Sequence, residues 1–201
     1  MKFTHTLKNL GTGTIGRDIP FMGLWSLIQI PPGGTMIIPV KPQGKRKALP
    51  YRDYFNVIPP ERMSFTGDVV TVKIDGNYRS KYGIAPWGAE ERLAFLSKAD
   101  ADRNGVLFVK EFSVEPGGTY LDHPWGKPSE YGDAIQMYND DGKMGGFAEI
   151  ECHGPAKVLP ENGVEKHTVT VLVYTGKLDE LKKIAAKVLR RDIGTIKLFE
   201  N

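Results

Sequence analysis

The stretch YGDAIQMYNDDGKMGGFAEIECHGP (residues 131–155) is the most informative part of the chain for both fold and site. It contains two strand-like runs, residues 134–138 and 146–152, separated by Asn, Asp and Gly. Side chains alternate across a strand, so Glu149, Glu151 and His153 share one face while Ile150 and Cys152 share the other. A carboxylate buried without a partner is costly, so the acidic face points either to bulk water or into a polar concavity that receives a ligand.

The rest of the chain shows similar short runs broken by Gly, Pro, Asn and Asp. The other predicted strands are residues 3–7, 23–29, 35–40, 69–74, 93–97, 106–112, 165–174 and 195–199. Trp25 lies in the apolar string GLWSLIQI and is expected in the core. Regular spacing with little helix between the strands predicts a mainly β protein, an antiparallel β-sandwich formed by residues 1–201 as a single domain.

One segment has helical rather than strand periodicity, and it predicts a helix over residues 178–191. Asp179 and Glu180 open this segment and Lys187, Arg190 and Arg191 close it, which suits the helix dipole. Its apolar stripe consists of Leu178, Leu181, Ile184, Ala185, Val188 and Leu189. We therefore expect one C-terminal amphipathic helix packed on the sandwich.

Composition limits the classes of partner. The 201 residues carry a net charge of +3, and the basic cluster at residues 41–47 is typical of a solvated loop, so no nucleic-acid partner is expected. The single cysteine, Cys152, excludes an internal disulfide framework and is expected to be an inert core thiol. The sequence shows no signal peptide and no run long enough to cross a membrane, so a cytoplasmic protein without membrane contact is expected.

A calcium-loop pattern occurs at residues 100–111. Oxygen-bearing side chains stand at Asp100, Asp102 and Asn104, with Gly105 at the sixth position and Glu111 at the twelfth. The exit side lacks room for a helix before Pro and Gly, and the second half is rich in β-forming residues. We interpret DADRNG as a hairpin turn in which Asp and Asn cap their own backbone and Gly takes a positive φ, and we expect neither a metal nor a cofactor.

Several motifs together resemble an uncharacterised bacterial family grouped with the galactose-mutarotase-like, or aldose-1-epimerase-like, proteins. The resemblance covers nearly the whole chain and corresponds to the C-terminal portion of those longer proteins. Its motifs are DYF (53–55), PPERM (59–63), DGNYRSKYGIAP (75–86), NGVLFVKEF (104–112), EYGDAIQMYNDDG (130–142) and GGFAEIECHGPA (145–156). The resemblance implies a shortened mutarotase-like supersandwich with a sugar-sized cleft on its concave face.

The resemblance also implies roles for individual residues. Mutarotases use a Glu as base on the anomeric hydroxyl and a His as acid on the ring oxygen, because one group takes a proton while the other gives one. IECHGP (150–155) is most similar to the Glu motif, so Glu151 is the first candidate base and Glu149 the second. The stretch that corresponds to the acid contains no His, and His153, His123 or His167 would have to substitute.

Three functions follow from these patterns. The first is carbohydrate binding without catalysis, for which the ligand-binding candidates are Arg79, Lys81, His123, Trp125, Tyr131 and Asp133 beside the acidic pair. The second is a sugar-active enzyme, either an epimerase or a lyase, with Glu151, Glu149 and His153 as catalytic candidates. The third is a structural or assembly module. Since a shortened sandwich leaves open edges, we also predict a homodimer.

Overall fold

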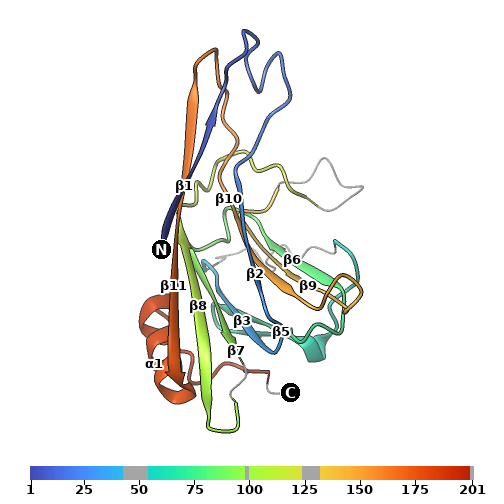
Figure 1. Cartoon of the computed structure of the whole chain (residues 1–201), viewed down its shortest axis with the longest axis vertical. Helices are drawn as coiled ribbons and strands as arrows, with labels where there is room; N and C mark the ends of the chain where they lie inside the picture. The colour runs from blue at the N-terminus through green and yellow to red at the C-terminus, as the bar shows by residue number, and fades with distance from the viewer. Residues whose placement is uncertain (43–53, 98–99, 124–131, 200–201) are drawn as a thin grey trace.

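The protein is an antiparallel β-sandwich with one helix at its C-terminal end, as predicted (Figure 1). The computed structural model describes residues 1–42, 54–97, 100–123 and 132–199. The large sheet has the strand order β1 (Lys2–Lys8), β11 (Val164–Lys177), β8 (Asn104–Phe112), β7 (Arg92–Ser97), β3 (Gly34–Pro39), β5 (Val69–Ile74) and β4 (Met63–Thr66). The small sheet has the order β2 (Trp25–Ile30), β10 (Ala148–His153), β9 (Ile135–Asn139) and β6 (Ser80–Ile84).

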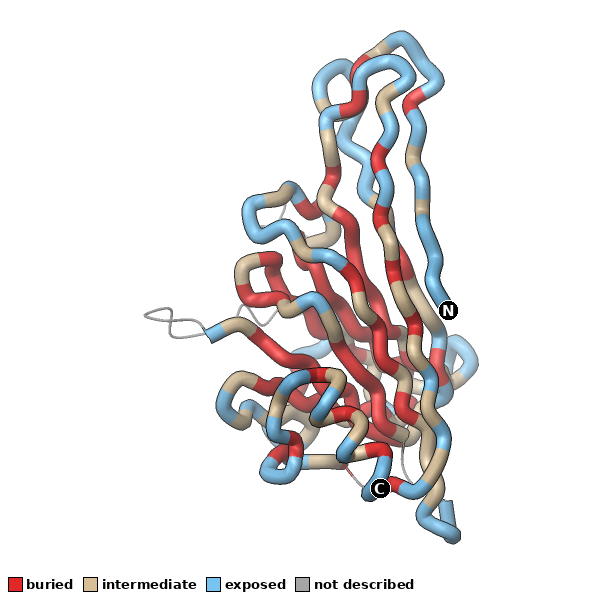
Figure 2. The backbone as a smooth tube through the Cα atoms, turned by 90° about the vertical axis from the view of Figure 1, so that its left-hand side faces the viewer, coloured by how far each residue is buried: buried red, intermediate tan, exposed pale blue. Residues whose placement is uncertain are grey.

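Two apolar layers hold the sheets and the helix together. The main core lies between the sheets and joins side chains of both, such as Met36 and Phe95 from the large sheet with Ile150 and Met137 from the small one. The second layer lies on the other face of the large sheet, where α1 (Leu178–Leu189) covers Leu107. Burial is concentrated in the central strands, whereas β1 has no buried residue and β11 mixes buried, intermediate and exposed residues (Figure 2).

Most predicted strands are confirmed, with small shifts at their ends. The exception is residues 195–199, which are not a strand. Their apolar side chains Ile196 and Phe199 are buried, and the Phe199 N–H donates to Thr35 Oγ1 at 2.8 Å. The apolar pattern therefore reflects packing without a strand ladder. Strands β4 and β6 were not predicted, and a short 3-10 helix, Pro60–Arg62, precedes β4.

The C-terminal helix is confirmed, but its predicted end at residue 191 is wrong. Helix α1 ends at Leu189 because Arg190 adopts the left-handed conformation, with φ 54° and ψ 42°. The Arg190 N–H still donates to the Ala186 carbonyl, which closes the last turn. The buried stripe of Leu178, Leu181, Ala185 and Leu189 faces the large sheet as the periodicity predicted.

The calcium-like segment forms the turn of the β7–β8 hairpin, as predicted. Asp100 Oδ1 accepts the Asn104 N–H at 2.7 Å, so this side chain caps the turn. The residue with positive φ is Arg103, at 60°, and the prediction that a glycine takes this conformation is wrong. Glu111 lies seven residues further along β8, about 23 Å from Asn104 at roughly 3.3 Å per residue. It therefore cannot bind the same ion as the side chains of the turn.

A substitution in this turn distinguishes a backbone cap from a calcium ligand. Asp100→Ala should lower the melting temperature slightly, because the Asn104 N–H loses its acceptor. Addition of Ca²⁺ should leave the melting temperature of both proteins unchanged. Thermal unfolding with Ca²⁺ and with a chelator measures this, and a Ca²⁺-dependent rise confined to the wild type would contradict the turn interpretation.

Candidate functional site

The candidate site lies on the face of the small sheet that points away from the large sheet, which we call the outer face. Strand pairing sets Glu151 between Leu27 and Gln136, and Glu149 between Gln29 and Tyr138. The outer face consists of Trp25, Leu27, Gln29, Lys81, Gly83, Gln136, Tyr138, Glu149, Glu151 and His153. The alternate residues, among them Ile150 and Cys152, are buried in the core between the sheets, so the alternation predicted from the sequence is confirmed.

Glu151 is the centre of the site. Its carboxylate is fully buried, at 0% exposure, yet its Oε2 accepts a hydrogen bond from Trp25 Nε1 at 2.9 Å and pairs with Lys81 Nζ at 3.1 Å. Lys81 Nζ also lies 3.2 Å from Asp122 Oδ2. Lys81 is positioned by β6, and its side chain reaches over β9 to meet Glu151 on β10. One ammonium group therefore bridges two carboxylates.

The electrostatic balance around Glu151 is incomplete. Burial raises the pKa of the Glu151 carboxyl above its usual value, although Lys81 and the Trp25 N–H oppose this shift. Glu151 Oε1 is buried and has no hydrogen-bond partner among the described residues. A buried acceptor without a partner is costly in a folded protein, and a bound ligand, water or ion can supply the missing interaction.

A chain of hydrogen bonds fixes the polar side chains beside Glu151. The Tyr54 hydroxyl donates to Asp133 Oδ2 and accepts from Gln136 Nε2, the latter at 2.5 Å. Gln136 Oε1 lies 3.0 Å from His153 Nε2. Because the Gln136 amide N–H₂ is directed at Tyr54, its carbonyl oxygen must accept from His153, which places the proton of His153 on Nε2.

Burial keeps the His153 imidazole neutral. Burial lowers the pKa of His153 to about 3, so the ring is uncharged at neutral pH and its Nδ1 keeps a lone pair. Its ring lies parallel to that of Trp25, with centroids 6.1 Å apart and an interplanar angle of 4°. A neutral ring of this kind can accept a proton or a metal through Nδ1, but it is not an imidazolium acid.

Trp25 forms one wall of the site, and the prediction that it lies in the core is wrong. Its side chain is 55% exposed because residue 25 falls on the outer face, in step with Leu27 and Gln29. Apolar residues of GLWSLIQI lie on both faces of β2, and those that contact the core are Ile28 and Ile30. Lys81 Nζ lies 5.7 Å from the Trp25 ring and 5.1 Å from the Tyr54 ring, both within cation–π range.

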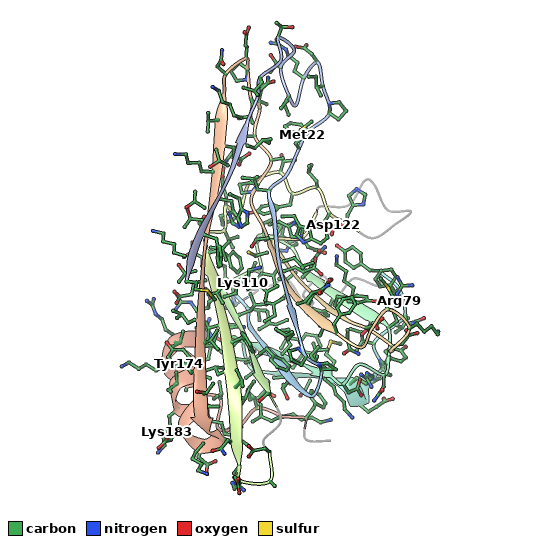
Figure 3. The ribbon with its side chains drawn as sticks, viewed as in Figure 1. Met22, Arg79, Lys110, Asp122, Tyr174 and Lys183 are labelled. Atoms are coloured by element: carbon green, nitrogen blue, oxygen red, sulfur yellow. The ribbon has the colours of Figure 1, made fainter. Side chains whose placement is uncertain are left out.

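Arg79 forms a second centre further along the outer face. Its guanidinium lies 4.1 Å from the centroid of the Phe55 ring, and its Nε donates to the Tyr138 hydroxyl at 3.3 Å. Arg79 and Asp122 both lie on the side of the small sheet away from α1 (Figure 3). Glu149 belongs to this outer part, where Oε1 accepts from Gln29 at 3.4 Å.

The structure thus assembles some of the predicted site residues and separates others. It brings together Glu151, His153, Lys81 and Asp133, whereas Glu149 and Arg79 lie further out on the same face. His123 is half-buried in the segment next to Asp122. Two candidates, Trp125 and Tyr131, lie outside the described residues.

Sequence reasoning missed Tyr54, Asp122 and Gln136. Gln136 was detectable, because it alternates with Ile135 and Met137 on a predicted strand and so shares a face with Tyr138. Tyr54 and Asp122 lie in connections between strands, far from Glu151 in the sequence, so no periodic pattern indicates them.

A second buried charge lies beneath the site, between the sheets (Figure 3). Lys110 on β8 crosses the core and donates to the carbonyls of Ser26, at 2.5 Å, and Ile150, at 3.1 Å. Burial lowers the pKa of Lys110 and raises that of the neighbouring Cys152 thiol to about 11. The prediction that Cys152 is a buried core thiol is confirmed, and its raised pKa disfavours the reactive thiolate.

Buried His167 makes stability depend on pH. Burial, with His5 and Lys110 nearby, lowers its pKa to about 4 from the ordinary 6.5. The stability contributed by the neutral ring is complete above pH 6.5 and is lost as the pH falls through about 4. We expect the free energy of unfolding to fall over this range, and to fall less steeply in His167→Gln. Urea unfolding at several pH values measures the slope, and equal slopes in the two proteins would contradict this assignment.

Across the described residues, no helix has both the length and the apolar character to cross a membrane. Neither curated proteins nor solved structures give a match. A family model does match, over residues 2–200, and its description is a family of unknown function, DUF6786. Because this match spans nearly the whole chain, the protein belongs to the DUF6786 family of unknown function.

Proposed function

We propose that the outer face of the small sheet binds a small carbohydrate. The observation that carries this proposal is the exposed Trp25 ring, whose own N–H is bonded to the buried carboxylate of Glu151. An aromatic face packs well against the C–H face of a pyranose, while the adjoining charged groups suit its hydroxyls. The resemblance to galactose-mutarotase-like proteins supports the same class of ligand.

The groups around Glu151 match the hydrogen-bonding needs of a polyol. Each hydroxyl both donates and accepts, and the site offers a carboxylate acceptor beside an ammonium donor. Glu151 Oε1 has no partner among the described residues, so a ligand hydroxyl would satisfy a group that the protein leaves unpaired. Sites built around such buried polar groups discriminate strongly between hydroxylated ligands and analogues that lack the hydroxyl.

Saturation-transfer NMR over a panel of aldohexoses, aldopentoses and hexuronates tests this proposal. At least one class should give signals, and Trp25→Ala and Glu151→Gln should each remove them. Phe65→Ala is the matched control, because Phe65 is an aromatic side chain of similar exposure, at 53%, on the edge strand β4 of the large sheet. No signal from any sugar, or signals that survive both site substitutions, would overturn the proposal.

A second candidate function is proton transfer on the sugar, as in an aldose 1-epimerase. The observation that favours it is the contact at 3.1 Å between the Glu151 carboxylate and the Lys81 ammonium. Glu151 would take the proton of the anomeric hydroxyl, and the ring would open as the ring oxygen receives a proton. Lys81 is a better candidate than His153 for the acid that protonates the ring oxygen, because His153 is a neutral ring with a pKa of about 3.

Anomer-exchange NMR separates binding from catalysis. If Glu151 is a base, exchange on a bound aldose should be faster than in buffer and should be lost in Glu151→Gln. If the site only binds, exchange should equal the buffer rate while saturation transfer remains.

The predicted homodimer stays a prediction, and light scattering of the purified protein measures it.

A further inference from the structure

Three potential metal ligands lie close together around Glu151 on the outer face of the small sheet. One donor atom each from Asp122, Glu151 and His153 lies within 4.8 Å of the other two. Glu151 and His153 are alternate residues of β10 on its outer face, and Asp122 belongs to the connection between β8 and β9. We propose that these residues bind a divalent transition-metal ion such as Zn²⁺.

Lys81 already places one cationic group within reach of both carboxylates. Its Nζ lies 3.1 Å from Glu151 Oε2 and 3.2 Å from Asp122 Oδ2. A single ammonium leaves one negative charge of the two carboxylates uncompensated. A divalent ion would balance both, and the released Lys81 ammonium has the Trp25 and Tyr54 rings within cation–π range.

A separate observation is the unpaired oxygen of Glu151. The side chain is fully buried, and Oε1 has no hydrogen-bond partner among the described residues. Lys81 and Trp25 both bond to Oε2, so neither satisfies Oε1. A metal ion held by both oxygens of this carboxylate would take the place of Lys81 at Oε2 and would also satisfy Oε1.

The hydrogen bonds of His153 also suit metal binding. Metal-binding histidines usually donate their second ring N–H to an oxygen acceptor, which fixes the tautomer and the ring orientation. Gln136 Oε1 accepts the Nε2–H of His153 at 3.0 Å, and Tyr54 in turn holds Gln136. This arrangement leaves the Nδ1 lone pair for the ion.

The donor types favour zinc over calcium or magnesium. One imidazole with two carboxylates is a nitrogen-and-oxygen set that suits Zn²⁺ and related ions, whereas Ca²⁺ and Mg²⁺ prefer oxygen alone. Donors around a tetrahedral zinc lie about 3.3 Å apart, so the group must contract. The Asp122 side chain, 37% exposed and outside the strands, is the member able to close.

Calorimetric titration of chelator-treated protein with ZnCl₂, without sugar, tests the proposal. The wild type should bind one equivalent. Glu151→Gln should weaken binding by more than about 100-fold, and Gln136→Leu by about 10- to 100-fold, the range for residues that orient a ligand. Lys81→Met should tighten binding by about tenfold, because the competing cation is removed.

Glu165→Gln is the matched control, since Glu165 is a buried carboxylate on β11 of the large sheet whose Oε2 has no hydrogen-bond partner among the described residues, and it is not one of the three donors. It should bind Zn²⁺ like the wild type. Co²⁺ gives a second readout, because a bound ion produces visible absorption bands that Glu151→Gln should abolish. Absence of Zn²⁺ binding below about 1 mM, or equal binding by Glu151→Gln and wild type, would overturn the metal site whether or not a sugar binds.

Discussion

Replacing Gly83 by alanine is expected to destabilise the protein by about 3 kcal/mol, at the upper end of the range for overpacking. A Cβ at this position would lie 1.9 Å from Asp133 Oδ2 and 2.5 Å from its Cγ. Asp133 is fully buried and accepts the Tyr54 hydroxyl, so its carboxylate cannot retreat without breaking the hydrogen-bond chain to Gln136 and His153. The substitution should therefore disturb both the stability and the site.

Urea unfolding measures this effect, and Gly117→Ala provides the control. A Cβ at Gly117 meets nothing within 4 Å, and the backbone there is not left-handed. Gly117→Ala should leave the free energy of unfolding within about 0.5 kcal/mol of the wild type. If Gly83→Ala proves as stable as Gly117→Ala, the close approach of Asp133 to β6 is not present in the folded protein.

The second large effect is expected from Lys81→Met, which should cost about 3 kcal/mol at pH 7 because it leaves a buried charge without its partner. Glu151 is fully buried and Lys81 is its only ion-pair partner among the described residues. The double variant Lys81→Met/Glu151→Gln should recover most of this loss, because neither charge remains. Chemical unfolding of the four proteins in the cycle gives the coupling free energy.

The pH dependence of the same cycle has a definite sign. Without Lys81 the pKa of Glu151, already raised by burial, should rise further, so the folded protein binds a proton more readily than the unfolded chain. The destabilisation of Lys81→Met should therefore shrink as the pH falls from 7 towards 5. Lys143→Met is the control, since Lys143 pairs with Asp141 at the surface and should change stability little. A coupling near zero would show that Lys81 does not neutralise Glu151.

The fold was predictable because its signals are local. Alternation in residues 147–153 places Glu149, Glu151 and His153 on one face, and the helical stripe begins at Leu178 as the structure has it. Trp25 was wrongly placed because apolar neighbours on both faces of β2 hid its alternation. The predicted strand over residues 195–199 was wrong because burial alone, without pairing to another strand, produces the same apolar pattern.

The site was predictable only in part, because its contacts join distant segments. Lys81 and Glu151 are 70 residues apart, and Tyr54 and Asp133 are 79 apart. The sequence indicates that each of these four residues is polar and lies in or near a strand. Which of them contact one another depends on the order of the strands in the small sheet. Two further features follow from distances that only the folded structure supplies. They are the lack of a described hydrogen-bond partner for Glu151 Oε1 and the tautomer of His153.

The most direct test of the proposed carbohydrate site is the indole N–H signal of Trp25. This N–H donates to Glu151 at 2.9 Å, so a sugar that reaches the carboxylate must change its chemical environment. In a ¹⁵N-correlated spectrum, with the signal assigned through Trp25→Phe, titration with the sugar found by saturation transfer should shift the Trp25 indole peak in a saturable manner. Shifts elsewhere with an unchanged Trp25 peak would contradict a binding site on the outer face of the small sheet.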